Sequence, residues 1–150
     1  MPGDDADFAA YLAARWPSVV RTLVLLGASR ADAESVARTA LARCHDSWER
    51  VRREDDVDAH VYGEVLDRWR HHPADPGPHA LIEDDLRRAL EVELAKVTVE
   101  QREALVLTYV GELSEQQVAD VLGVPVSTVR ERVADGLAAI DLTTLGELLT

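Results

Sequence analysis

The stretch from Leu113 to Val133, LSEQQVADVLGVPVSTVRERV, constrains the fold most, because it carries the signals of two short helices and the turn between them. Ser114 and Gln117 have the spacing of a capping box, which predicts that a helix begins directly after the serine. Gly123 is typical of a helix end, and Pro125 suits the first turn of a new helix. The pattern predicts a helix-turn-helix, with an ordinary helical hairpin as the alternative.

The second helix of this pair has one apolar stripe, which predicts the side chains that face outward. At about 100° per residue, the positions opposite the stripe are small or polar, and Arg130 and Arg132 flank them. If this side enters a DNA groove, Glu131 points at the bases, where a carboxylate accepts a hydrogen bond from cytosine but repels phosphates. The stripe consists of Val129, Val133, Leu137 and Ile140, and the opposite side of Ser127, Glu131, Ala134 and Ala138.

The charge of the chain does not fit a protein that binds DNA unaided. The formal net charge is −12, and the helix pair itself is acidic. Autonomous DNA binding usually leaves a basic footprint. Either another molecule carries the helix pair to DNA, or the pair does not bind DNA. Between Ser114 and Ile140, Arg130 and Arg132 are outnumbered by Glu115, Asp120, Glu131 and Asp135.

The rest of the chain predicts further helices on either side of a break. Residues 71–79, HHPADPGPH, have the composition of a linker, and no segment alternates as a strand does. The sequence therefore predicts an all-α fold with two small helical domains, 1–72 and 80–150, joined by a short Pro- and Gly-containing linker, 73–79. The expected helices span 5–15, 17–26, 30–47, 58–71, 80–97 and 99–110, then the pair, with a start or kink at Pro17 and a short tail at 144–149.

Several classes of function are disfavoured by the composition. No phosphate-binding glycine loop, nucleophile elbow or metal-ligand spacing is found, so we expect no enzyme activity, metal or cofactor. Cys44 falls on an apolar helix stripe, which predicts a buried structural thiol. The apolar runs are too short to span a membrane, and the acidic N-terminus is unlike a signal peptide, so we expect a cytoplasmic protein without membrane contact.

Read in order, the chain resembles the small bacterial sigma factors of the extracytoplasmic function (ECF) group, within the sigma-70 superfamily. The resemblance runs from Phe8 to Ile140 through LGASRADAESVARTALARCHDSWERV and AHVYGEVLDRWR. It is strongest in QREALVL followed by LSEQQVADVLGVPVSTVRER. It implies a transcription initiation factor with core RNA polymerase, promoter DNA and an anti-sigma factor as partners. The N-terminal domain would melt the −10 element, and the C-terminal helix-turn-helix would read the −35 element.

The resemblance also implies which residues contact DNA. Ser127, Thr128, Arg130, Glu131 and Arg132 fall where the family contacts the −35 element. Trp48, Arg50, Arg52 and Arg53 lie near the family's −10 recognition segment, and Arg68 and Arg70 lie near duplex DNA at the edge of the melted region. The alternatives are core packing for Trp48 and Trp69, and ordinary solvated surface for the arginines. Arginines gathered on one continuous face would favour DNA, and scattered arginines would favour protein partners.

The chain departs from the family pattern at three places that face partners. Residues 32–38, DAESVAR, stand where the family has a run like DAEDLVQ that helps to contact the polymerase. Gly63 and Glu64 stand where an asparagine is common, and VADGLAAI follows Arg132 where further arginines are common. These departures keep a second hypothesis open, a sigma-like protein that has lost DNA binding and acts through protein contacts as a decoy or adaptor.

Overall fold

A computed structural model describes residues 2–54, 56–73, 89, 92–141 and 143 of the chain. Its helices are α1 (Pro2–Leu25), α2 (Arg30–Asp46), α3 (Trp48–Val51), α4 (Val57–Arg70), α6 (Val99–Tyr109), α7 (Glu115–Leu122) and α8 (Val126–Ala139). No strand occurs among these residues, which confirms the all-α prediction. We call α1 to α4 the N-terminal helices and α6 to α8 the C-terminal helices.

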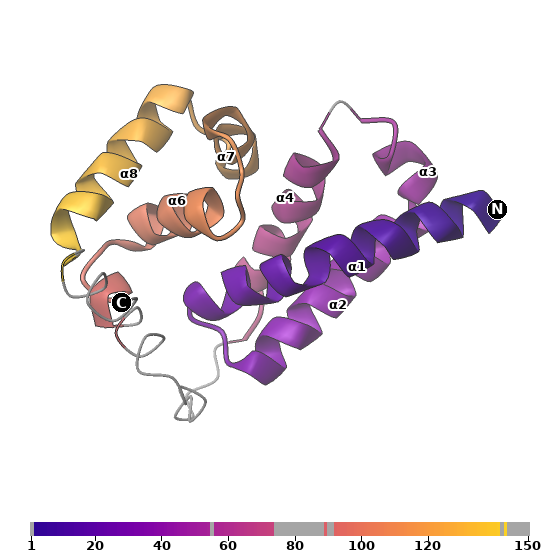
Figure 1. The fold of residues 1–150 in the computed structure, drawn as a ribbon, viewed down its shortest axis with the longest axis horizontal. Coiled ribbons are helices and arrows are strands. Elements are labelled where there is room, and N and C mark those ends of the chain that lie inside the picture. Colours follow the sequence, from indigo (N-terminus) through magenta and orange to yellow (C-terminus); the bar gives the residue numbers. More distant parts are fainter. Residues whose placement is uncertain (1, 55, 74–88, 90–91, 142, 144–150) are drawn as a thin grey trace.

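The two groups of helices lie side by side (Figure 1). In the N-terminal group, α2 packs against both α1 and α4, and the short α3 closes one end near α1. In the C-terminal group, α8 packs against α6 and α7. The two groups meet where α7 contacts α4 and α6 contacts α1, so that α8 lies on the outer side of the molecule.

The helix starts follow the capping signals of the sequence. Ser114 and Gln117 form the expected capping box at α7, and Thr98 and Gln101 form another at α6. Gly123 ends α7 in the left-handed conformation, with φ of 69°, which a glycine adopts without strain. The turn of the helix pair therefore has the geometry that its sequence predicts.

Two helix boundaries of the N-terminal group differ from the prediction. The segments predicted as 5–15 and 17–26 form one helix, because Pro17 lies inside α1 without ending it. A proline inside a helix costs about 3 kcal/mol, but the apolar side chains of α1 before and after Pro17 pack against one core, which offsets that cost. The prediction also missed α3 as a separate helix. Most of the predicted helix 80–97 and the tail 144–149 lie outside the described residues.

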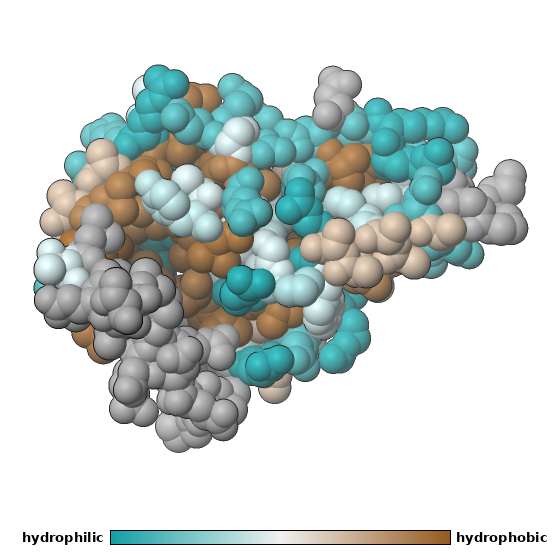
Figure 2. Space-filling view, viewed as in Figure 1, coloured by the Kyte–Doolittle hydropathy of each residue, from teal (hydrophilic) through white to brown (hydrophobic). Residues whose placement is uncertain are grey.

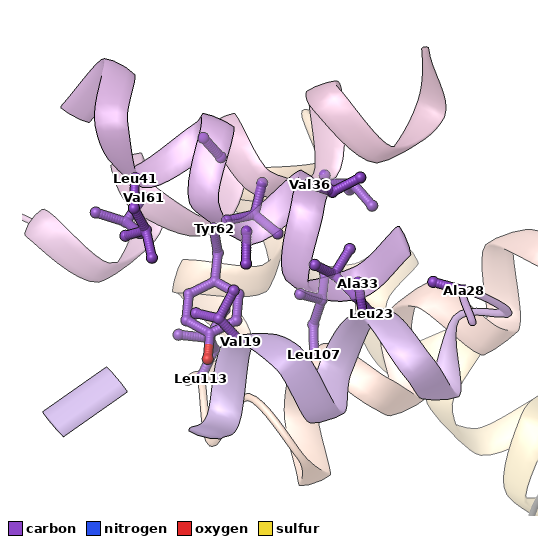
Figure 3. Packing of buried hydrophobic residues seen from close by; sticks show 14 of the residues in the cluster. Val19, Leu23, Ala28, Ala33, Val36, Leu41, Val61, Tyr62, Leu107 and Leu113 are labelled. Carbon is purple, nitrogen blue, oxygen red and sulfur yellow. The ribbon is translucent and has the colours of Figure 1, made fainter. Parts of the chain in front are cut away.

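One hydrophobic core joins the two groups of helices. Leu107, Leu113 and Val118 from the C-terminal part belong to the same buried cluster as Val19 and Tyr62 from α1 and α4. Figure 3 shows Leu107 and Leu113 beside these N-terminal side chains. The helix-turn-helix therefore rests directly on the N-terminal helices.

A second, smaller cluster lies between α6, α8 and the end of α1. It contains Leu25, Leu94, Leu105 and Val106, with Val133, Leu137 and Ile140 packed against it. On the face viewed in Figure 2, hydrophobic residues gather over α6 and α8. The apolar stripe predicted for α8 thus packs inward, Val129 in the shared core and the other three residues against this second cluster.

The shared core predicts that a cavity in α6 destabilises the N-terminal helices too. Leu107→Ala should lower the free energy of unfolding by about 2–5 kcal/mol, the usual cost of such a cavity. All three tryptophans lie in the N-terminal helices, so their fluorescence during urea unfolding reports on the other side of the interface. We expect the urea concentration at the midpoint of the tryptophan fluorescence curve to fall. Independent halves would leave that midpoint unchanged, and Val99→Ala, on the same helix but 70% exposed, is the matched control.

Candidate nucleic-acid interface

Helix α8 presents the predicted outer side to solvent. Ser127, Glu131, Ala134 and Ala138 are all exposed, whereas Val129 is fully buried, which confirms the orientation predicted from the sequence. Thr128 and Arg132 are half-buried at the margins of this side, and Arg130 is exposed. The first turn contains no acidic residue, so its free backbone N–H groups and helix dipole suit the approach of a phosphate.

Arg130 forms an ion pair within the helix pair. Its guanidinium donates a hydrogen bond to the carboxylate of Glu115, the first residue of α7. Both side chains are at least half exposed. Exposed ion pairs contribute only about 0–1 kcal/mol, so this contact restrains Arg130 weakly and can be exchanged for another anion.

The arginines at the end of α3 and directly after it form a second group. Arg52 pairs with Asp7 of α1 at 3.0 Å, and Arg53 pairs with Glu49 at 3.0 Å. Arg50 is exposed, and no described acidic group forms an ion pair with it. The ion pairs of Arg52 and Arg53 are weak, because their carboxylate partners are exposed. A phosphate can therefore replace these carboxylates.

Trp48 is a core residue rather than a surface one. It is 5% exposed, and its ring centroid lies 5.4 Å from those of both Phe8 and Tyr11. Trp69 is half-buried and stacks on His72 at 6.2 Å. Core packing, the alternative to base stacking, accounts for the positions of both tryptophans. Trp48 would have to leave the core before it could stack on a base.

Arg70, at the end of α4, is held by the C-terminal helices. Its Nη2 and Nε donate hydrogen bonds of 2.7 Å and 3.1 Å to the two carboxylate oxygens of Glu103 on α6. The Glu103 side chain is 6% exposed and that of Arg70 48%. These hydrogen bonds raise the pKa of the Arg70 guanidinium above its ordinary value. Two parallel charge-assisted bonds are among the strong polar contacts of proteins.

The predicted DNA-contacting arginines thus fall into three separate groups, one at the end of α3 and directly after it, one at the end of α4 and one on α8. Helix α4 separates the first two, and its 14 residues span about 20 Å. Arg68 is half-buried, and no ion pair joins it to another described residue. The structure therefore does not gather the arginines on one continuous face.

An apolar groove lies between α1 and α2. Its volume is about 660 Å³, and its lining is mainly aliphatic and aromatic. A polar rim accompanies this apolar floor, as is common at protein-binding sites. The main lining residues are Phe8, Leu12, Trp16, Leu41, Arg38 and His45.

Other kinds of site were sought in the part of the chain that the structure describes. No group of three or more His, Cys, Asp or Glu side chains there could hold a metal ion. None of its helices is long and apolar enough to cross a membrane. Cys44 is 1% exposed in the shared core, as the helix stripe predicted.

The C-terminal helices and the chain as a whole are similar to known sigma factors. Residues 87–140 match the family model described as sigma-70, region 4. The chain is 26% identical to the RNA polymerase sigma-E factor of Streptomyces coelicolor, over 92% of this chain and 86% of that relative. It is 27% identical to the RNA polymerase sigma-E factor of Streptomyces antibioticus, over 92% and 84%.

Solved structures share the fold. The sigma factor RpoE, in complex with the anti-sigma factor NepR from Bartonella quintana, matches with a TM-score of 0.70 and 19% identity over 95% of this chain and 96% of that chain. A chain in the complex of the anti-anti-sigma factor PhyR with NepR, also from Bartonella quintana, matches with a TM-score of 0.57 and 14% identity over 85% and 48%. Residues 87–140 thus match sigma-70 region 4, and the chain is similar to RNA polymerase sigma-E factors over most of its length.

Burial of Cys44 predicts an unreactive thiol. Removal from water raises the pKa of this thiol to about 11, so almost no thiolate, the nucleophilic form, exists at pH 8. Ellman's reagent should leave the native protein unlabelled at pH 8 and label one thiol per chain in denaturant. Rapid labelling of the native protein would contradict the buried position.

Proposed function

We propose that the chain is a sigma factor, which directs RNA polymerase to promoters and takes part in transcription initiation without covalent chemistry. The outward face of α8 within the sigma-70 region 4 match supports this proposal most directly. In it, α8 reads the −35 element and the N-terminal helices open the −10 element. The partners are core RNA polymerase, promoter DNA and an anti-sigma factor, and the place of action is the cytoplasm.

Docking on the polymerase explains how a chain with this acidic charge reaches DNA. A chain of net charge −12 gains little from DNA phosphates by itself. Once it is docked on the polymerase, α8 is held near the promoter at a high effective concentration, so a small number of contacts is sufficient. The apolar groove between α1 and α2 is our candidate docking surface for the polymerase on the N-terminal domain.

Each predicted residue then has a part in DNA recognition. Arg130 and Arg132 contact phosphates beside the groove, while Ser127, Thr128 and Glu131 face the base edges. Arg50, Arg52 and Arg53 lie along the −10 strand, and Arg68 and Arg70 face the adjacent duplex. Trp48 has a supporting role in this scheme, because it packs behind the −10 segment.

The proposed domain boundaries are 1–72 and 80–150, with 73–79 as the linker. A linker of this length reaches at most about 25 Å when it is extended. Docking at two sites of a large polymerase therefore requires that the sites lie close together or that helix ends next to the linker unwind.

A second candidate function is a sigma-like regulator that acts through protein contacts. The separation of the arginines into three groups, most of them paired with carboxylates, favours this candidate. The same fold also occurs in the complex of an anti-anti-sigma factor with its partner, so it is compatible with both classes of function.

Reconstitution with core RNA polymerase separates the two candidates. A sigma factor should form a stable complex with the core enzyme, and that complex should open promoter DNA from the source genome, which permanganate footprinting detects as reactive thymines. A decoy or adaptor would give a complex without open DNA. Failure to bind the polymerase at all would contradict the initiation role.

Glu131 should contribute base discrimination at the cost of affinity. Glu131→Ala removes an acceptor for cytosine, which we expect to reduce discrimination at one base pair by about 1–3 kcal/mol. It also removes a charge that repels phosphates, so binding to unrelated −35 sequences should become tighter. Competition binding by the holoenzyme measures both effects. Glu100→Ala, on an exposed part of α6, is the control, and identical base preference in the Glu131 variant would contradict this role.

A further inference from the structure

The apolar groove between α1 and α2 is hollow because several of its lining side chains are small. Ala9 and Ala13 of α1 and Ala42 of α2 line it, and all three are exposed. A methyl group reaches less far than a larger apolar side chain, so space is left between these positions. The groove volume of about 660 Å³ lies within the range of about 300–1,000 Å³ that is usual for small-molecule sites. The larger side chains around the hollow are Phe8, Leu12, Trp16 and Leu41.

One cation of the groove has hydrogen-bonding capacity to spare. The Arg38 side chain is 70% exposed, and the ion pair that it forms with Glu34 measures 3.9 Å, which is too long for a hydrogen bond. Glu34 lies closer to Arg30, at 3.3 Å. Arg38 also belongs to the departures from the family pattern, because it ends the run DAESVAR where the family has glutamine. The guanidinium of Arg38 is therefore available to an added anion.

The polar groups at the other end of the groove bind each other. His45 Nε2 lies 3.0 Å from a carboxylate oxygen of Asp5, and the His45 ring packs on Phe8 with the ring centroids 4.7 Å apart. Helices α1 and α2 run antiparallel (Figure 1), so Arg38, about two turns before His45, lies towards Trp16. The groove is thus apolar along its length, with an available cation towards the Trp16 end.

We propose that this groove binds one fatty acid, with the carboxylate on Arg38 and the acyl chain along α1 towards Phe8. Charge complementarity selects an anion, because no acidic side chain is among the described residues that line the groove. One guanidinium suits one carboxylate. Charges farther away than about 8–10 Å are largely screened at physiological salt, so the net charge of −12 does not exclude an anion here.

The two parts of the ligand contribute differently to binding. Removal of each methylene group from water is favourable, so the acyl chain supplies most of the affinity through contacts with side chains such as Leu12 and Trp16. The hydrogen bond from Arg38 to the carboxylate is charge-assisted, and an alcohol of the same chain length cannot form it in that way. Preference for the acid over the alcohol is therefore the signature of a built site rather than of general adsorption to apolar surface.

A fatty acid in this groove also has a regulatory consequence. The groove is the candidate docking surface for the polymerase, so the ligand and the polymerase compete for it. This second part of the inference rests on the proposed function, whereas binding of the fatty acid itself does not. The chain would then be withdrawn from transcription when free fatty acid accumulates.

Isothermal titration with dodecanoate, below its micellar concentration, tests the site. We expect saturation at one molecule per chain and roughly tenfold weaker binding to Arg38→Gln, because that variant loses the charge-assisted hydrogen bond. Dodecanol has the same chain without the charge, and it should bind the parent chain about as weakly as dodecanoate binds the variant. Arg43→Gln, exposed on the same helix but outside the groove, is the matched control and should bind like the parent chain.

A second variant fills the hollow itself. Ala42→Leu places a larger side chain in the groove, so dodecanoate should bind at least tenfold more weakly. Ala31→Leu, at an exposed position of α2 outside the groove, is its control, and circular dichroism checks that both variants keep their helices. Equal binding by the parent chain, Arg38→Gln and Ala42→Leu would overturn the site, as would uptake of many molecules without saturation.

Competition with core RNA polymerase tests the regulatory part. Dodecanoate at ten times its Kd should weaken the complex of the parent chain with the core enzyme about tenfold, and dodecanol at the same concentration only about twofold. Transcription by core enzyme alone from DNA ends is the control for direct effects on the polymerase. Unchanged polymerase binding at saturating dodecanoate would overturn the competition. A chain that binds one dodecanoate but never binds the polymerase would overturn the proposed function and leave the site standing.

Discussion

The packing of α7 and α6 against the N-terminal helices is the constraint on which the rest of this structure depends. It combines an apolar core, shared by residues such as Leu107 and Tyr62, with the buried carboxylate of Glu103 bound to Arg70. A buried carboxylate without its partner is costly, so the pair favours one placement of the two helix groups over others. This placement leaves α8 on the outside and α4 on the inside. The outward side of α8 is therefore accessible, whereas Arg70 at the end of α4 is bound by Glu103.

The acidic charge of the chain has a physical role in this account. A DNA-binding protein with surplus carboxylates binds promoters poorly when free and depends on a large partner to hold it near them. Carboxylates that pair with the arginines proposed to contact DNA strengthen that dependence, because each must be displaced before a phosphate can bind. Glu115 at Arg130 is exposed and easily displaced, whereas Glu103 at Arg70 is buried and is not.

Local features of the sequence predicted the local structure well. The capping box of Ser114 and Gln117 and the left-handed Gly123 act within one turn, so the helix pair and the outward side of α8 follow from spacing alone. The continuity of α1 across Pro17 depends on tertiary packing, which overrides a local signal. Contacts between the helix groups could not be predicted. Glu103 follows three polar residues and precedes the apolar run 104–107, so its position does not identify a partner 33 residues away.

The distance between the two helix groups tests the central claim most directly. Fluorophores at the exposed positions Glu49, after the start of α3, and Ala138, near the end of α8, report on that distance by resonance energy transfer. The account predicts one high-efficiency population for the free chain and a shift to low efficiency when core RNA polymerase is added. Low efficiency in the free chain, or high efficiency in a polymerase complex that opens DNA, would contradict it.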